Sequence, residues 1–186
     1  MIFRSLLRKA ATVTGALLLA SCGVTPIPRP APPPPPAAPP PAPAPVPLAI
    51  DWRDWPIAAG DWSYRAADGG SLASFGVAGQ PAQLMVRCEA ASRRISLSRA
   101  TANGQGQIAG QMMIRTTAGD VQWPVMPGSA PGGAASYAVA TRAAVDSGFD
   151  RMIFSRGRFA VEVPGAAPIA IPAWAEVARV VEDCRG

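Results

Sequence analysis

The chain of 186 residues contains no histidine, and its one lysine is Lys9. Serine nucleophiles are activated by histidine or lysine in the common hydrolases, and histidine is the most frequent metal ligand. Serine–histidine and serine–lysine catalysis are therefore excluded, and we expect no metal site and no cofactor. Because nothing in the spacing of the acidic residues selects a carboxylate pair, we also expect no enzymatic activity.

The larger part of the chain carries almost no net charge. The formal net charge of +5 comes mainly from four basic residues before position 49, which leaves 13 arginines against 12 acidic residues in 49–186. This part is close to neutral, so it offers no basic surface for a nucleic acid. DNA and RNA are therefore excluded as predicted partners.

The N-terminus has the features of a bacterial secretion signal. Arg4, Arg8 and Lys9 form a positive region, and a stretch of eleven apolar or small residues follows at 10–20. As a helix this stretch would span about 16 Å, which is too short for a hydrocarbon core of about 30 Å. It therefore predicts a cleaved signal peptide over residues 1–21, not a membrane span.

The end of this segment, Leu19-Ala20-Ser21-Cys22, resembles the lipobox of bacterial lipoproteins. The resemblance implies that Cys22 is lipidated, with palmitate among its acyl chains, and becomes the N-terminus after cleavage. The membrane would then be a partner through this anchor. Gly23 stands where an aspartate would favour the inner membrane, so we expect the outer membrane, with the head in the periplasm or at the cell surface. An ordinary secretory signal is the alternative.

Proline dominates the next segment, so residues 22–48 are predicted to be a tether. Residues 23–48 hold 14 of the 22 prolines and a single charge. Such a segment cannot form a core and adopts polyproline II, which extends by about 3.1 Å per residue, or roughly 80 Å in all. The alternative is a docking tract for a proline-recognition domain.

The remaining 138 residues, 49–186, form one predicted domain. Short alternating segments predict strands. We place them at residues 61–67, 71–77, 83–89, 93–99, 111–117, 121–126, 136–142, 158–163 and 169–171. Pro124 should keep its strand at a sheet edge, and residues 127–135 read as a loop. Helical spacing predicts one or two turns at 146–154 and a helix at 173–184. Pro172 stands at the start of this second helix, where a proline is tolerated. The expected fold is mainly β, a small antiparallel β-sandwich or open barrel with a short C-terminal α-helix.

Two cysteines, Cys88 and Cys184, lie in this predicted domain. An even pair in an exported domain predicts a disulfide, here between a strand and the final helix. A reactive or metal-binding thiol pair is the alternative, although no histidine or CxxC motif accompanies either cysteine.

Two groups of residues are candidates for ligand binding. Trp52 and Trp55 lie among three tryptophans within eleven residues, where exposed indoles would stack on sugar rings. The alternative is that they pack the leading segment onto the sheet. Arg156 and Arg158 flank a glycine and would bind a carboxylate or phosphate. Alternatively, they pair with acidic residues of the final helix or with Glu162.

Residues 154–186, residues 54–65 and the Arg87-Cys88 pair together resemble a family of small alphaproteobacterial lipoproteins and exported proteins. More remotely, the order of strands, cysteine, helix and second cysteine is similar to the exported β-domains of the invasion-associated locus B type. The resemblance implies a periplasmic or surface β-domain without known catalysis, and it brings no functional residues with it.

These observations favour a non-enzymatic envelope lipoprotein that presents a disulfide-bonded binding or scaffolding domain on a polyproline tether. Its partner would be an envelope protein or peptidoglycan. One alternative is a periplasmic lysozyme inhibitor, because residues 132–142 resemble the glycine-serine-tyrosine loop of those proteins. Another is a glycan-binding or glycan-degrading envelope protein.

Overall fold

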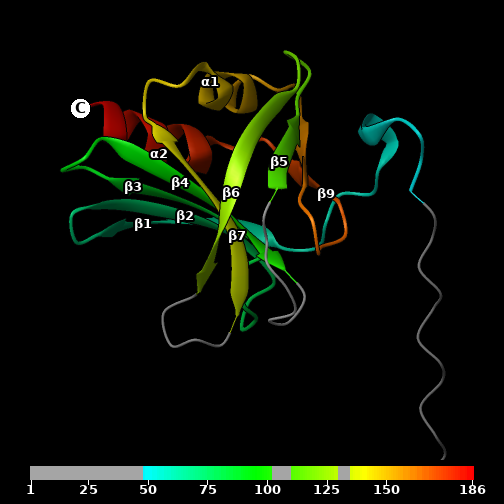
Figure 1. Ribbon diagram of the computed structural model, residues 1–186, viewed down its shortest axis with the longest axis horizontal. Coiled ribbons are helices and arrows are strands. Elements are labelled where there is room, and N and C mark those ends of the chain that lie inside the picture. Colours follow the sequence, from blue (N-terminus) through cyan, green and yellow to red (C-terminus); the bar gives the residue numbers. More distant parts are fainter. Residues whose placement is uncertain (1–47, 102–109, 130–134) are drawn as a thin grey trace, which may run out of the picture. The chain divides into compact units, whose positions relative to one another are not determined.

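The computed structural model describes residues 48–101, 110–129 and 135–186, which belong to the compact unit Pro45–Gly186. This unit is mainly β, with 48% of the described residues in nine antiparallel strands that form a curled half-barrel (Figure 1). The strands are β1 (Asp61–Ala67), β2 (Gly70–Gly76), β3 (Leu84–Glu89), β4 (Arg94–Thr101), β5 (Gly110–Arg115), β6 (Val121–Ser129), β7 (Ser136–Ala143), β8 (Arg158–Glu162) and β9 (Ile169–Pro172). The predicted open-barrel class with a C-terminal helix is confirmed.

The strand order in the sheet is β1-β2-β3-β4-β7-β6-β5-β8-β9. Hairpins with short turns connect most neighbours, and β1 and β2 are joined by Asp68 and Gly69. Gly69 has a φ of +75°, a conformation that glycine adopts without steric cost. Along the sequence, the β5–β6 hairpin lies between β4 and β7. In the sheet β4 and β7 are neighbours, so their pairing joins segments that are distant in sequence.

Pro124 does not place its strand at the edge of the sheet, because β6 pairs with both β5 and β7. The pairing with β5 covers Val121–Val125, whereas the pairing with β7 begins only at Met126. At Pro124, therefore, β6 is paired with β5 alone. The N–H that proline lacks need not interrupt the hydrogen bonds between strands there. The predicted loop at 127–135 is also wrong in its first part, since β6 continues to Ser129. Residues 130–134 lie outside the described residues.

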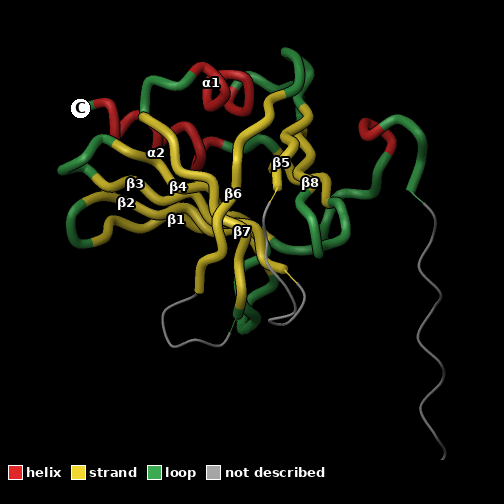
Figure 2. Tube along the Cα trace, viewed as in Figure 1, coloured by secondary structure: helices red, strands yellow, loops and turns green. Residues whose placement is uncertain are grey.

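The described residues of this unit also form three helical segments: η1 (Trp52–Asp54), α1 (Ser147–Ile153) and α2 (Ala175–Arg185). The prediction of a helix begun by Asp146 is confirmed, because its side chain accepts from Gly148 N at 2.9 Å. Pro172 does not start α2; it ends β9, and Trp174 is the N-cap residue. Helices α1 and α2 lie side by side (Figure 2). Within the described residues, no helix is long and apolar enough to cross a membrane.

The core lies between the inner face of the sheet and the two α-helices. Alternate residues of the strands point inward, such as Phe75 on β2 and Leu97 on β4, both fully buried. α2 contributes a buried face to this core. Its buried residues are Val177, Val180, Val181 and Cys184. Trp174, three residues before Val177, is 49% exposed because it precedes the first helical turn.

A disulfide joins Cys88 on β3 to Cys184 on α2, as the sequence predicts. The two Cα atoms are 5.5 Å apart, and both side chains are buried. The bond closes a separation of 96 residues and fastens the last helix to the inner face of the sheet.

Candidate functional site

The segment that follows the proline tract lies against the last hairpin of the sheet. Trp52 and Trp55 are only 7% and 8% exposed and pack on Ala160 of β8 and Ala170 of β9. Trp55 Nε1 donates a hydrogen bond to the Ala49 carbonyl oxygen at 2.7 Å. This burial agrees with the packing alternative for the two indoles, because stacking on a sugar needs an open ring face.

Asp51 fixes the local turn of this segment. Its carboxylate accepts a hydrogen bond from Arg53 N at 2.9 Å and thereby caps η1. This backbone bond, together with the Arg53 side chain, holds the pKa of Asp51 below its ordinary value. The Arg53 guanidinium lies over the Trp52 ring, 4.9 Å from its centroid.

Arg158 joins the tryptophan segment to β8. Its Nη1 donates to the Trp55 carbonyl oxygen at 2.8 Å, and within the described residues it forms no ion pair with the acidic residues expected as its partners. Three of the four predicted ligand residues, Trp52, Trp55 and Arg158, thus come together. Arg156 does not join them: its backbone N–H donates to Thr117 Oγ1 at 2.9 Å, and its side chain is exposed.

A cleft of about 360 Å³ opens beside this segment. It is lined by Ile50, Asp51, Trp52, Arg53, Trp55 and Arg115. Arg115, which the sequence analysis did not single out, forms ion pairs with Glu162 at 2.6 Å and with Asp120 at 2.9 Å. The hydrogen bond that Arg115 donates to Glu162 raises the pKa of Arg115 above its ordinary value. Because the guanidinium groups of Arg115 and Arg53 are already paired with carboxylates, the cleft offers little unneutralised charge to an anionic ligand.

A second cleft, of about 410 Å³, lies between β1 and α2. Tyr64 is one of its lining residues and donates to Asp183 Oδ2 at 2.7 Å, which raises the pKa of Tyr64. The Arg179 guanidinium covers the Tyr64 ring at 4.0 Å from the centroid. No group of three or more potential metal ligands occurs in the part of the chain that the structure describes. The polar side chains at this cleft therefore connect β1 to α2 at the surface.

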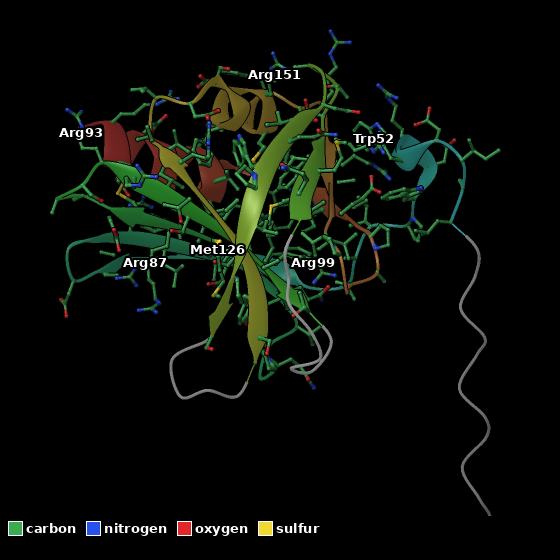
Figure 3. The ribbon with its side chains drawn as sticks, in the orientation of Figure 1. Trp52, Arg87, Arg93, Arg99, Met126 and Arg151 are labelled. Atoms are coloured by element: carbon green, nitrogen blue, oxygen red, sulfur yellow. A yellow bond between two sulfur atoms is a disulfide. The ribbon has the colours of Figure 1, made fainter. Side chains whose placement is uncertain are left out.

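Arg99 is the functional candidate that the sequence analysis missed. It is 7% exposed and points to the inner face of β4, beside the turn between β8 and β9 (Figure 3). The signal was present in the alternation of Ile95 and Leu97, because a period of two places residue 99 on the same inner face. A charged residue at an inward position of a strand is uncommon enough to mark a site.

The segment that resembles the loop of lysozyme inhibitors is partly in strand β7. Tyr137 is 2% exposed there and donates to the Ala82 carbonyl oxygen at 3.0 Å. Burial raises its pKa above the ordinary value of 10.0. In this conformation Tyr137 is a core residue and is not displayed for contact with another protein.

Comparisons of the chain with protein-family models, with curated proteins and with solved structures found no match.

Proposed function

We propose that the protein is a lipid-anchored component of the bacterial cell envelope. In this proposal Cys22 carries the acyl chains, residues 23–48 act as a stiff spacer, and the half-barrel is a binding or scaffolding head. The head would face the periplasm or the cell surface from the outer membrane, and its partner would be an envelope protein or peptidoglycan.

The observation that carries the proposal is the distribution of the three cysteines. Cys88 and Cys184 are joined to each other in the core, and Cys22 is the third cysteine of the sequence. A buried disulfide is typical of exported proteins. A single further cysteine directly after a signal-like segment is what lipid attachment requires, and several acyl chains give the stable anchoring that one chain does not.

The character of the head favours binding over catalysis. It has no lysine or histidine to activate a nucleophile. In each of its two described clefts that contain arginine, a polar lining residue is already bound to a carboxylate outside the lining, Arg115 to Glu162 and Tyr64 to Asp183. A glycan-binding head is the second candidate function, and the cleft beside Trp52 and Arg53 is the feature that favours it.

The anchor is tested by growing cells with an alkyne-bearing palmitate analogue and comparing the native chain with Cys22→Ser. We expect the native protein to be labelled and to sediment with the outer membrane, and the variant to lose both properties. A Cys88→Ala/Cys184→Ala chain is the matched control, because it loses two cysteines and keeps Cys22. Labelling that persists in Cys22→Ser would remove the anchor from the proposal.

The partner is tested by crosslinking in intact cells, with mass spectrometry of what the native chain and Cys22→Ser capture. One envelope protein enriched only with the lipidated chain would support a docking head. Capture of peptidoglycan fragments alone would favour the glycan alternative, and the residue to replace next would be Arg53, which lines the cleft and has an exposed side chain.

A further inference from the structure

Arg99 is a buried cation whose position is held by backbone carbonyls. Its Nη1 donates to the carbonyl oxygens of Gln83, at 3.1 Å, and of Ala100, at 3.0 Å. Its Nη2 donates to the Ala167 carbonyl oxygen, in the turn between β8 and β9, at 3.0 Å. These bonds place the guanidinium between the β3–β4 part of the sheet and the last hairpin.

The guanidinium of Arg99 is not fully used by these contacts. Its Nε–H is buried and has no hydrogen-bond partner among the residues that the structure describes. The guanidinium has five N–H donors, and Nε with Nη2 forms the edge that binds carboxylates and phosphates through two parallel bonds. Within the described residues, that edge is engaged only by the single bond from Nη2 to Ala167.

The chain has no counter-ion to offer Arg99. All twelve acidic residues lie between positions 51 and 183, and the segments 1–47, 102–109 and 130–134 contain none. None of the ion pairs among the described residues includes Arg99. The burial also lowers the pKa of this arginine through desolvation alone.

A purely structural role leaves this arrangement unexplained. A neutral donor could also make hydrogen bonds to these three carbonyl oxygens, whereas a buried charge without a partner of opposite sign carries a large desolvation cost. Buried arginines in proteins are accordingly almost always paired. A buried Arg99 guanidinium without an acidic partner in the chain is explained if its partner is an anion from outside the chain.

We propose that Arg99 is the receptor for an external oxyanion, a carboxylate or a phosphate, that accepts hydrogen bonds from the Nε/Nη2 edge. The ligand would neutralise the buried guanidinium and would strengthen the link between β4 and the β8–β9 turn. This inference rests on the proposal that the half-barrel is a binding head, and it does not depend on the lipid anchor.

The test follows the arginine Nε–H resonances of the ¹⁵N-labelled Cys22→Ser chain during titration with sodium acetate or sodium phosphate. Sodium chloride keeps the ionic strength constant. We expect the Arg99 resonance to shift saturably with at least one oxyanion, and the identity of that anion distinguishes a carboxylate ligand from a phosphate ligand. Arg87, an exposed arginine on the neighbouring strand β3, is the internal reference and should move little.

Thermal unfolding in the same salts supplies the second measurement. The effective oxyanion should raise the unfolding midpoint of the Cys22→Ser chain and of its Arg87→Gln variant, and it should leave the midpoint of Arg99→Lys unchanged. Lysine keeps the charge and loses the two-pronged edge. If the Arg99 resonance moves no more than that of Arg87, the proposal is overturned, and this result decides even if Arg99→Lys fails to fold. Equal stabilisation of Arg99→Lys would overturn it as well, while either failure would leave the palmitate-labelling result unaffected.

Discussion

The bond between Cys88 and Cys184 should contribute a large part of the stability of the head. It closes a loop of 96 residues, for which the chain-entropy relation gives about 4.7 kcal/mol at 25 °C. Small domains have a total free energy of unfolding of about 5–15 kcal/mol. Reduction should therefore leave the head close to the limit of folding, even though the apolar face of α2 still packs on the sheet.

Urea unfolding of the oxidised and the reduced native chain measures this contribution. The two forms differ only in the covalent bond, because reduction leaves both sulfur atoms in the core. With a slope of about 2 kcal/mol per molar urea, the expected loss lowers the midpoint by about 2 M. The slope itself should rise on reduction, since an unfolded chain without the crosslink exposes more surface. The Cys88→Ala/Cys184→Ala variant should resemble the reduced chain and should not respond to reductant.

The reasoning fails if reduction lowers the midpoint by less than about 0.5 M while the slope stays the same. Such a result would mean that the crosslink restricts the unfolded chain far less than loop closure implies. A large loss in the double variant combined with a small loss on reduction would assign the effect to packing of the sulfur atoms instead of chain entropy.

Two further predictions concern the packing of the head. Gly148→Ala should lower the free energy of unfolding by about 1–3 kcal/mol, although alanine favours helices. The reason is that its Cβ would collide with Trp123 Cζ2 and lie 3.0 Å from Val121 Cγ1. Thermal unfolding of the variant at or above the native midpoint would contradict this prediction. The chain has two tyrosines, and the pKa of each is raised, that of Tyr64 by its hydrogen bond to Asp183 and that of Tyr137 by burial. Absorbance at 295 nm should therefore show less ionisation of the phenols at pH 10.0 in the folded chain than in the unfolded chain. The stabilisation from these neutral phenols should be intact below that pH and lost as the pH rises through the folded pKa values. Equal ionisation of the folded and unfolded chains at pH 10.0 would contradict the assignment.

The local part of the fold could be predicted because its signals are local. The strand predicted at residues 61–67 has the bounds of β1, and the final helix and its disulfide partner were also predicted. In these segments the alternation of apolar residues and the glycine turns determine the structure over a few neighbours. The predicted start of α2 was wrong because Pro172 is equally suited to end an edge strand such as β9.

The order of the strands could not be predicted in the same way. The pairing of β4 with β7 encloses the whole β5–β6 hairpin, and no local pattern distinguishes it from a simple succession of neighbours. The role of Pro124 was misjudged for this reason, since the strand changes partner within its own length. The bond from Arg158 to Trp55 spans 103 residues and likewise depends on the assembled sheet.

The crowding of tryptophans directly after the proline tract has a mechanical explanation if the protein is tethered. Any pull through the tether would act on the chain at residue 48 and reach the head through the segment that contains Trp52 and Trp55. That segment is fastened by the two buried indoles and by Arg158, and it continues into a parallel bridge between Ile57 and Ala170 of β9. Trp62 then donates from β1 to the Pro172 carbonyl oxygen at 2.8 Å, so the two end strands are linked before the load reaches the main sheet. Burial of these indoles is what an attachment point needs, and their clustering therefore indicates anchorage more strongly than it indicates a sugar site.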